Sequence, residues 1–273
     1  MSEAPQPSYR PTFWSLAAWL AAAFLSTLSG IGGGTFAVPI LHYLVRLPFQ
    51  MAIGTSLVVV FSMTLVATIV EFLQADSALD WTVVGLLVAG GLPGAQLGYW
   101  IGKRIDTRTL KALFVLLLVA AAIRISSLHG GGEERAAAGV ALSAAKVLWI
   151  LLIGVGGGIL APLLGIGGGL LVIPALFLTL SDMSYLEARA CSLAMSVVNS
   201  VQAAYLHLRD GTAHVPTALP FTGVALIGAV LGVWAVHRPG WGEVARVVLV
   251  VVLVLMSVRL TWDVWRSRAE KRV

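Results

Sequence analysis

The sequence predicts an all-α polytopic membrane protein with two inverted repeats, each made of a Gly-broken helical hairpin plus three transmembrane helices. Three observations lead to this fold class: few charged residues, many long apolar stretches, and one pattern that occurs twice. Of the 273 residues, 58% are hydrophobic and 11% are charged, whereas a soluble domain carries about 25% charged residues. The low share of charge indicates that much of the surface faces lipid.

Eight apolar stretches are long enough to cross a bilayer, which takes about 20 residues of α-helix. In chain order they lie at about 13–29, 53–73, 81–101, 110–128, 145–164, 190–208, 217–236 and 243–262. Two shorter stretches, at about 35–45 and 170–180, each follow a glycine cluster. We expect each to form a helical hairpin broken at the glycines. Whether the hairpins re-enter or cross fully stays open, so the expected number of spans is eight to ten.

The two halves of the chain resemble each other at a nearly constant offset. LSGIGGGTFAVPIL at 28–41 matches LLGIGGGLLVIPAL at 163–176. GTSL at 54–57 corresponds to ACSL at 190–193, GAQLG at 94–98 to GAVLG at 228–232, and LVAAAIRI at 118–125 to LVLMSVRL at 253–260. Such an offset indicates a duplicated unit. We therefore divide the chain into an N-terminal tail (1–12), a first repeat (13–128), a linker (129–144), a second repeat (145–262) and a basic tail (263–273).

Loop charges predict the orientation of these repeats. The loop at 102–111 and the C-terminal segment from Arg259 to Arg272 are rich in Lys and Arg, which favours the cytoplasm, whereas the loop at 74–80 has Asp76 and Asp80 and no basic residue. Three full crossings and a hairpin in each half turn the second half upside down, as in many secondary transporters. Both termini are then cytoplasmic. The net charge of +5 fits this orientation in a lipid bilayer better than a nucleic-acid partner.

The two glycine clusters are the sharpest candidates for a site. Unsatisfied backbone groups cost several kcal/mol each in lipid, so such clusters must be buried in protein or line a wet cavity. Because a helix restarts after each cluster, its free N–H groups and positive dipole end favour an anion. The expected substrate-binding backbone is that of Gly32, Gly33, Gly34, Gly167, Gly168 and Gly169. Tight helix packing is the alternative, and it is our interpretation of the ladder Gly90, Gly94, Gly98 and Gly102.

Polar side chains beside these clusters complete the candidate site. Thr55 and Ser56 occur at the same place in the first half as Cys191 and Ser192 in the second, near the start of a predicted helix. There they cap the helices or contact the substrate, and the sequence leaves both readings open. Deeper in the second half, Asn199 and Gln202 line a pathway or bond across helices.

Charged and catalytic groups are scarce inside the predicted spans. Glu71 comes closest, and we expect it at the membrane interface near the outer end of its helix. An anion would therefore be held by backbone amides and hydroxyls. The sequence has no Gly-x-Ser-x-Gly elbow, no His-Glu-x-x-His motif and no P-loop, and its five histidines form no ligand pair. We expect no enzyme activity, no metal and no cofactor.

Together these motifs resemble the TauE/SafE sulfite exporter family. The likeness rests on two GIGGG clusters, each followed by an apolar run and a proline (Pro39 and Pro174), then GTSL or ACSL, then GAxLG, and it covers about residues 13–262. The resemblance implies a multi-pass transporter in the plasma (inner) membrane for sulfite, sulfonates or similar small sulfur-containing anions, often as an exporter. Thr55 stands where the second half has Cys191, which argues against a paired-cysteine relay.

We therefore expect a secondary transporter that exports a small anion such as sulfite or an organosulfonate by alternating access around the glycine clusters. The alternatives are an anion channel on the same scaffold and a non-transporting membrane subunit. The partners considered are the small inorganic or organosulfur anion, the bilayer, a proton or other coupling ion, and a second copy in a homodimer. The sequence decides neither the exact substrate nor the coupling ion nor the oligomeric state.

Overall fold

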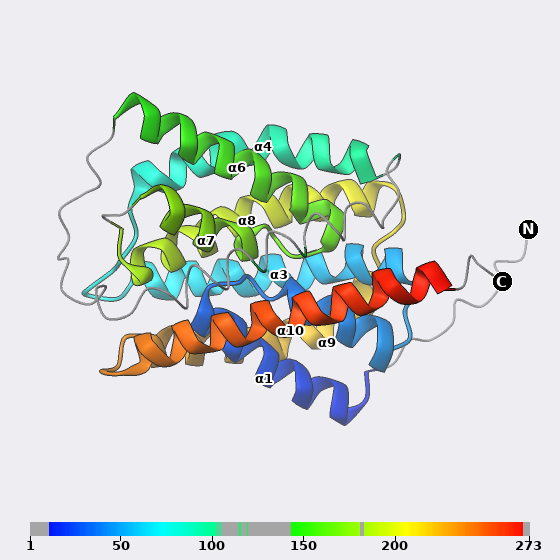
Figure 1. The fold of residues 1–273 in the computed structure, drawn as a ribbon. Coiled ribbons are helices and arrows are strands. Elements are labelled where there is room, and N and C mark those ends of the chain that lie inside the picture. The colour runs from blue at the N-terminus through cyan, green and yellow to red at the C-terminus, as the bar shows by residue number, and fades with distance from the viewer. Residues whose placement is uncertain are drawn as a thin grey trace, which may run out of the picture.

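A computed structural model describes residues 11–102, 143–180 and 183–269, together with residues 104, 115 and 119. Every element in these segments is helical (Figure 1). Apart from residues 115 and 119, the expected span at 110–128 lies outside the described residues, as does nearly all of the linker at 129–144. The helices are α1 (Phe13–Ser29), α2 (Gly34–Pro39), the π-helix η1 (Ile40–Leu44), α3 (Phe49–Phe72), α4 (Trp81–Gly102), α6 (Ala144–Leu164), α7 (Gly169–Thr179), α8 (Tyr185–Arg209), α9 (Val215–Val236) and α10 (Trp241–Ala269).

Two helices begin well before their predicted starts. Helix α3 begins at Phe49, directly after Pro48, instead of at 53. Helix α8 begins at Tyr185 instead of at 190, because Ser184 and Glu187 form a reciprocal capping box. The hydropathy criterion missed the first turns of α8, which contain Glu187 and Arg189. As a result Thr55 and Cys191 lie in the second turns of their helices, so the interpretation of these positions as helix caps was wrong.

Four of the described helices, α3, α4, α6 and α9, are long and apolar enough to cross a membrane. Helix α1 and the segment Gly34–Leu44, which combines α2 and η1, are shorter apolar helices. Helix α8 is as long as the spanning helices but carries many polar side chains, and most of these are buried. A polar helix is stable at membrane depth when protein rather than lipid surrounds it.

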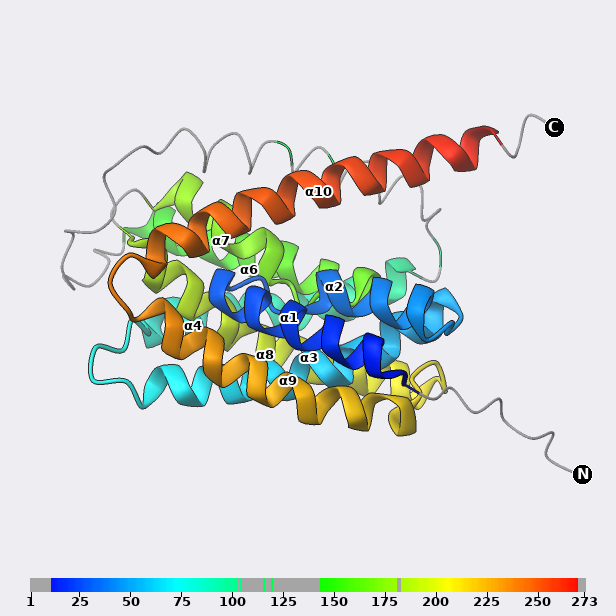
Figure 2. The same cartoon turned by 90° about the horizontal axis from the view of Figure 1, so that it is seen from below.

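Helices α3 and α8 pack against each other in the middle of the molecule. Figure 1 shows α4 and α6 on one side of this pair and α1, α9 and α10 on the other. Helix α4 packs along α6, and α1 packs along α9. Figure 2 shows α10 lying along one outer face. We call the end of the molecule where α1 begins and α4 and α8 finish the inner end, following the predicted orientation, and the opposite end the outer end.

The glycine ladder of α4 is a packing face, as predicted. A Cβ atom on Gly90, Gly94 or Gly98 would collide with a backbone carbonyl oxygen of α6. In return, a Cβ on Gly154 or Gly158 of α6 would collide with carbonyl oxygens of α4. Small residues let the two backbones approach this closely, so α4 and α6 form one tight unit beside the central helices.

Candidate functional site

The two glycine breaks, residues 30–34 and 165–169, meet in the interior of the molecule. Gly30 caps the C-terminus of α1 and Gly165 caps that of α6, both in the left-handed conformation with φ of 76° and 71°. A Cβ on Gly34 would overlap the carbonyl oxygen of Gly165, and one on Gly169 would lie 2.8 Å from that of Ile31. Only glycine permits both the turns and this approach. The structure thus brings the six predicted glycines together from both halves.

Two serines bind the breaks in a crossed pattern. Ser56 Oγ donates to the carbonyl oxygen of Gly165 at 3.1 Å, and Ser192 Oγ donates to that of Gly30 at 3.0 Å. Each serine therefore binds the break of the other half, and Ser192 Oγ also lies 3.3 Å from the carbonyl oxygen of Gly169 in the break of its own half. Carbonyl groups freed by a broken helix need such partners at membrane depth. The two serines hold the breaks against α3 and α8.

Thr55 and Cys191 point away from the breaks. The Thr55 hydroxyl oxygen accepts a 2.9 Å bond from the backbone N–H of His214, which precedes α9. Cys191 Sγ lies 3.7 Å from the carbonyl oxygen of Asp80, which precedes α4. The four side chains expected beside the glycines therefore separate into two serines at the breaks and two residues that contact the starts of other helices.

Donor groups collect where α7 begins. The N–H of Leu171 donates to the carbonyl of Gly168. Among the described residues, no hydrogen bond leaves the N–H groups of Gly167, Gly168 and Gly169. Gly168 itself has φ of 94° and precedes the first residue of the helix. These free donors and the positive end of the α7 dipole make the second break electropositive.

Asn199 of α8 lies directly beside this second break. Its side chain is fully buried, and neither Oδ1 nor Nδ2 has a hydrogen-bond partner. A Cβ on Gly168 would lie 3.2 Å from Nδ2. The first break has an apolar neighbour at the same place, since Met63 and Trp19 lie closest to Gly33. A buried amide without partners costs stability, so Asn199 marks the polar side of the site.

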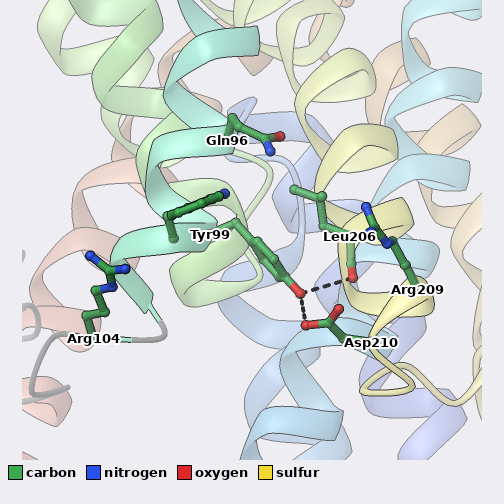
Figure 3. Close-up of a pocket in the computed structure, with 7 residues that line it drawn as sticks. Gln96, Tyr99, Arg104, Leu206, Arg209 and Asp210 are labelled. Atoms are coloured by element: carbon green, nitrogen blue, oxygen red, sulfur yellow. Dashed lines mark hydrogen bonds between the residues drawn. The ribbon is translucent and has the colours of Figure 1, made fainter.

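A cavity lies at the inner end of the molecule. It has a volume of about 340 Å³ and lies between α4 and α8 (Figure 3). Figure 3 shows Tyr99 of α4 reaching across to α8, where its hydroxyl donates to the carbonyl of Leu206 at 3.3 Å and to the Asp210 carboxylate. We call this cavity the vestibule; its lining residues are Gln96, Tyr99, Trp100, Arg104, Leu206, Arg209 and Asp210.

One face of α8 connects the vestibule to the second break. Asn199, Gln202, Leu206 and Arg209 are spaced three or four residues apart, which places them on one side of the helix. Gln202 Nε2 donates to the carbonyl of Leu92 at 3.0 Å, and its buried Oε1 has no partner. The two residues expected along a pathway therefore lie one turn apart, between the vestibule and Gly168.

A charged cluster lies at the outer end around Glu71, one residue before the last residue of α3, and its side chain is fully buried in protein. Glu71 Oε2 lies 2.7 Å from Nη1 of Arg189, which is also fully buried, and Oε1 lies 3.0 Å from Nε2 of His237. The capping-box pattern Ser184-x-x-Glu187 is the sequence signal that would have placed Arg189 inside α8. Among the described residues, no three His, Cys, Asp or Glu side chains group closely enough to hold a metal ion.

Comparison with known proteins gives one family and several relatives. A family model described as "Sulfite exporter TauE/SafE" matches residues 1–125 and 150–273. A "Probable membrane transporter protein" of Xylella fastidiosa is 35% identical over 98 residues, which is 35% of this chain and 37% of that protein. The probable membrane transporter MamO of Paramagnetospirillum magneticum is 31% identical over 112 residues, 39% of this chain and 18% of that protein.

A third relative, the probable membrane transporter YunE of Bacillus subtilis, is 28% identical over 96 residues, 35% of this chain and 34% of that protein. The matches thus span little more than a third of the length of these relatives, or less. No solved structure matches the chain.

Proposed function

Because the chain belongs to the sulfite exporter TauE/SafE family, whose members are membrane transporters and not enzymes, we propose that it is a secondary transporter that exports a small anion such as sulfite or an organosulfonate. One observation carries the proposal: the fully buried amide of Asn199 has no partner and lies against Gly168, where α7 begins. A polar group kept unpaired in the interior is ready to bind a ligand that supplies the missing bonds.

The chemistry of the second break suits an oxyanion. Its oxygens would accept bonds from the free N–H groups of Gly167 to Gly169 and from the Asn199 amide. The start of α7 adds the favourable dipole. No full countercharge touches this place in the described residues, so the anion would be held without an ion pair and could leave again. Weak, multiple bonds of this kind suit a transported substrate better than a tightly held one.

The route from the inner end follows the same face of α8. Arg104 and Arg209 give the vestibule an excess of positive charge over Asp210, which attracts small anions. Gln202 lies between the vestibule residue Leu206 and Asn199 on this face, and its Nε2 group is a donor that could turn from the carbonyl of Leu92 to a passing anion. We infer that the anion enters from the cytoplasm, which is the side that an exporter must load.

Alternating access between two inverted halves is part of the proposal. It is supported by the hydrogen bonds of Ser56 and Ser192, because each serine bonds to the glycine break of the other half. Figure 1 adds that α1 and α6, the helices that lead into the two breaks, begin at opposite ends of the molecule. The described residues line a cavity at the inner end, and a buried ion pair joins α3 and α8 at the outer end. We take this as an inward-facing state with both termini in the cytoplasm.

Sulfite flux into proteoliposomes of the purified protein tests the proposal. We expect saturable uptake that a proton gradient accelerates, with sulfate and a sulfonate as competitors that rank the substrates. Empty liposomes and the Asn199→Leu variant are the controls. A conductance without saturation would replace the transporter by a channel. Absence of flux for all three anions from folded protein would overturn the proposal.

A further inference from the structure

Three ionisable side chains contact one another at the outer end, away from the proposed anion site. We call Glu71, Arg189 and His237 the outer cluster. We propose that this cluster is the proton site of the transporter: Glu71 takes a proton through His237, releases Arg189, and thereby allows the outer end to open. This inference rests on the proposed transport function and names its coupling ion.

The outer cluster joins four helices from both halves. Arg189 of α8 donates from Nη1 to Glu71 of α3 at 2.7 Å and from Nε to the carbonyl oxygens of Thr27 and Leu28 of α1, each at 3.1 Å. His237, the residue after α9, lies 3.0 Å from the second carboxylate oxygen. Helices α1, α3, α8 and α9 therefore cannot separate at this end without breaking these bonds.

The charge state of Glu71 decides how costly that separation is. With Glu71 ionised, opening the outer end must break a fully buried ion pair between the carboxylate and the Arg189 guanidinium. Separating opposite charges is unfavourable until water has replaced each partner. A proton on Glu71 removes the ion pair, so one of the two charges disappears before the helices part. A buried ionisable residue inside a membrane protein is by default a functional candidate for this reason.

His237 supplies the path for the proton. Its side chain is 15% exposed, whereas those of Glu71 and Arg189 are 0% exposed. An ionised carboxylate only accepts hydrogen bonds, so Nε2 of His237 carries the proton of the bond to Glu71. That proton moves to Oε1 while Nδ1 takes one from water at the outer end. The imidazole stays neutral, and the carboxylate becomes a carboxylic acid.

Three other ionisable side chains described near this end make contacts outside the cluster. Glu187 accepts from the N–H of Ser184, Asp80 caps α4, and Arg238 stacks on the ring of Trp234 at 3.9 Å. The thiol of Cys191 faces the carbonyl of Asp80. Arg189 keeps one buried nitrogen, Nη2, without a partner. If the ion pair had only a structural role, a further hydrogen bond to Nη2 would make it more stable. A pair that must break during transport loses fewer hydrogen bonds when Nη2 has none.

Glu71→Gln separates coupling from transport, because glutamine imitates the protonated carboxyl group but cannot release a proton. We expect this variant to exchange labelled sulfite for unlabelled sulfite across proteoliposomes while losing all stimulation by an imposed pH gradient. His237→Gln should keep some stimulation at a slower rate, since it interrupts only the path. Glu187→Gln is the matched control at the same end and should keep the wild-type response.

The outcomes are distinct. Absence of sulfite flux with the wild-type protein would refute the proposed function, and there would be no transport for proton movement to drive. Wild-type and Glu71→Gln proteins that respond equally to the gradient would overturn the proton site while leaving the transporter intact. If Glu71→Gln proves unstable, a pH-sensitive dye decides the question with the wild-type and His237→Gln proteins: sulfite-dependent proton movement must be slower in the variant, and equal rates would count against the proposal.

Discussion

Replacing Asn199 by leucine should stabilise the protein and abolish transport. The side chain is 0% exposed and both of its polar atoms lack partners. Each such group costs about 1–3 kcal/mol, so the amide costs about 2–6 kcal/mol relative to an apolar side chain of the same size. Leucine has the same number of heavy atoms but a larger volume, and overpacking in this close-packed place costs about 1–3 kcal/mol. The middle values of the two ranges leave a net gain of about 2 kcal/mol.

Thermal unfolding in one detergent measures the gain. For a chain of this size each kcal/mol raises Tm by about 2–4 °C. Sulfite flux in proteoliposomes measures the loss of function. Ser200→Ala is the control, because the Ser200 hydroxyl bonds to the carbonyl of Ser196 in its own helix and its loss should leave transport unchanged. A variant that transports normally would show that Asn199 does not bind the anion, and a lower Tm would show that its amide is satisfied after all.

Three further predictions concern the breaks and the vestibule. Gly168→Ala places an alanine at a φ of 94°, with its Cβ 2.5 Å from a carbonyl oxygen of α6. Strain and overpacking should lower the free energy of unfolding by about 2–5 kcal/mol. Gly211→Ala, with φ of 70° and no neighbouring atom within 4 Å, should lose only about 1–2 kcal/mol, and equal Tm values for the two would refute the close packing. Ser56→Ala and Ser192→Ala should each lower stability by a similar amount, about 1–3 kcal/mol, and a large inequality would count against their equivalent roles. Arg209→Gln should raise the half-saturating sulfite concentration for flux that starts at the inner end, with a smaller effect at high salt; an unchanged value would exclude the vestibule as the entry.

The sequence predicted most helices because their signals are local. The boundaries of α1 agree with the expected 13–29, and those of α4, α6 and α9 lie within two residues of the expected ones. Bilayer thickness sets the length of an apolar run, and glycine clusters interrupt it, so both can be read along the chain. The first turns of α8 were missed because Glu187 and Arg189 lower the hydropathy of a segment that is buried in protein. Hydropathy predicts which segments face lipid, and it does not predict whether a segment buried in protein is helical.

The sequence likewise predicted one part of the candidate site and not the other. The sequence by itself determined that two glycine breaks exist and that small polar residues follow each of them at matching positions. It could not determine which neighbour faces a break, because successive residues of a helix point about 100° apart. Ser56 binds the second break and Thr55 binds the start of α9, although the two are adjacent in the chain.

Only the tertiary structure decided which distant charged residues form an ion pair. Glu71 and Arg189 are separated by 118 residues, and each alone looks like a charge near a helix end. Their contact depends on how α3 packs on α8, which is set by many apolar contacts along both helices and by no local pattern. The chain sequence therefore determined the helices and their breaks, and helix packing decided which side chains meet at the two glycine breaks and at the outer cluster.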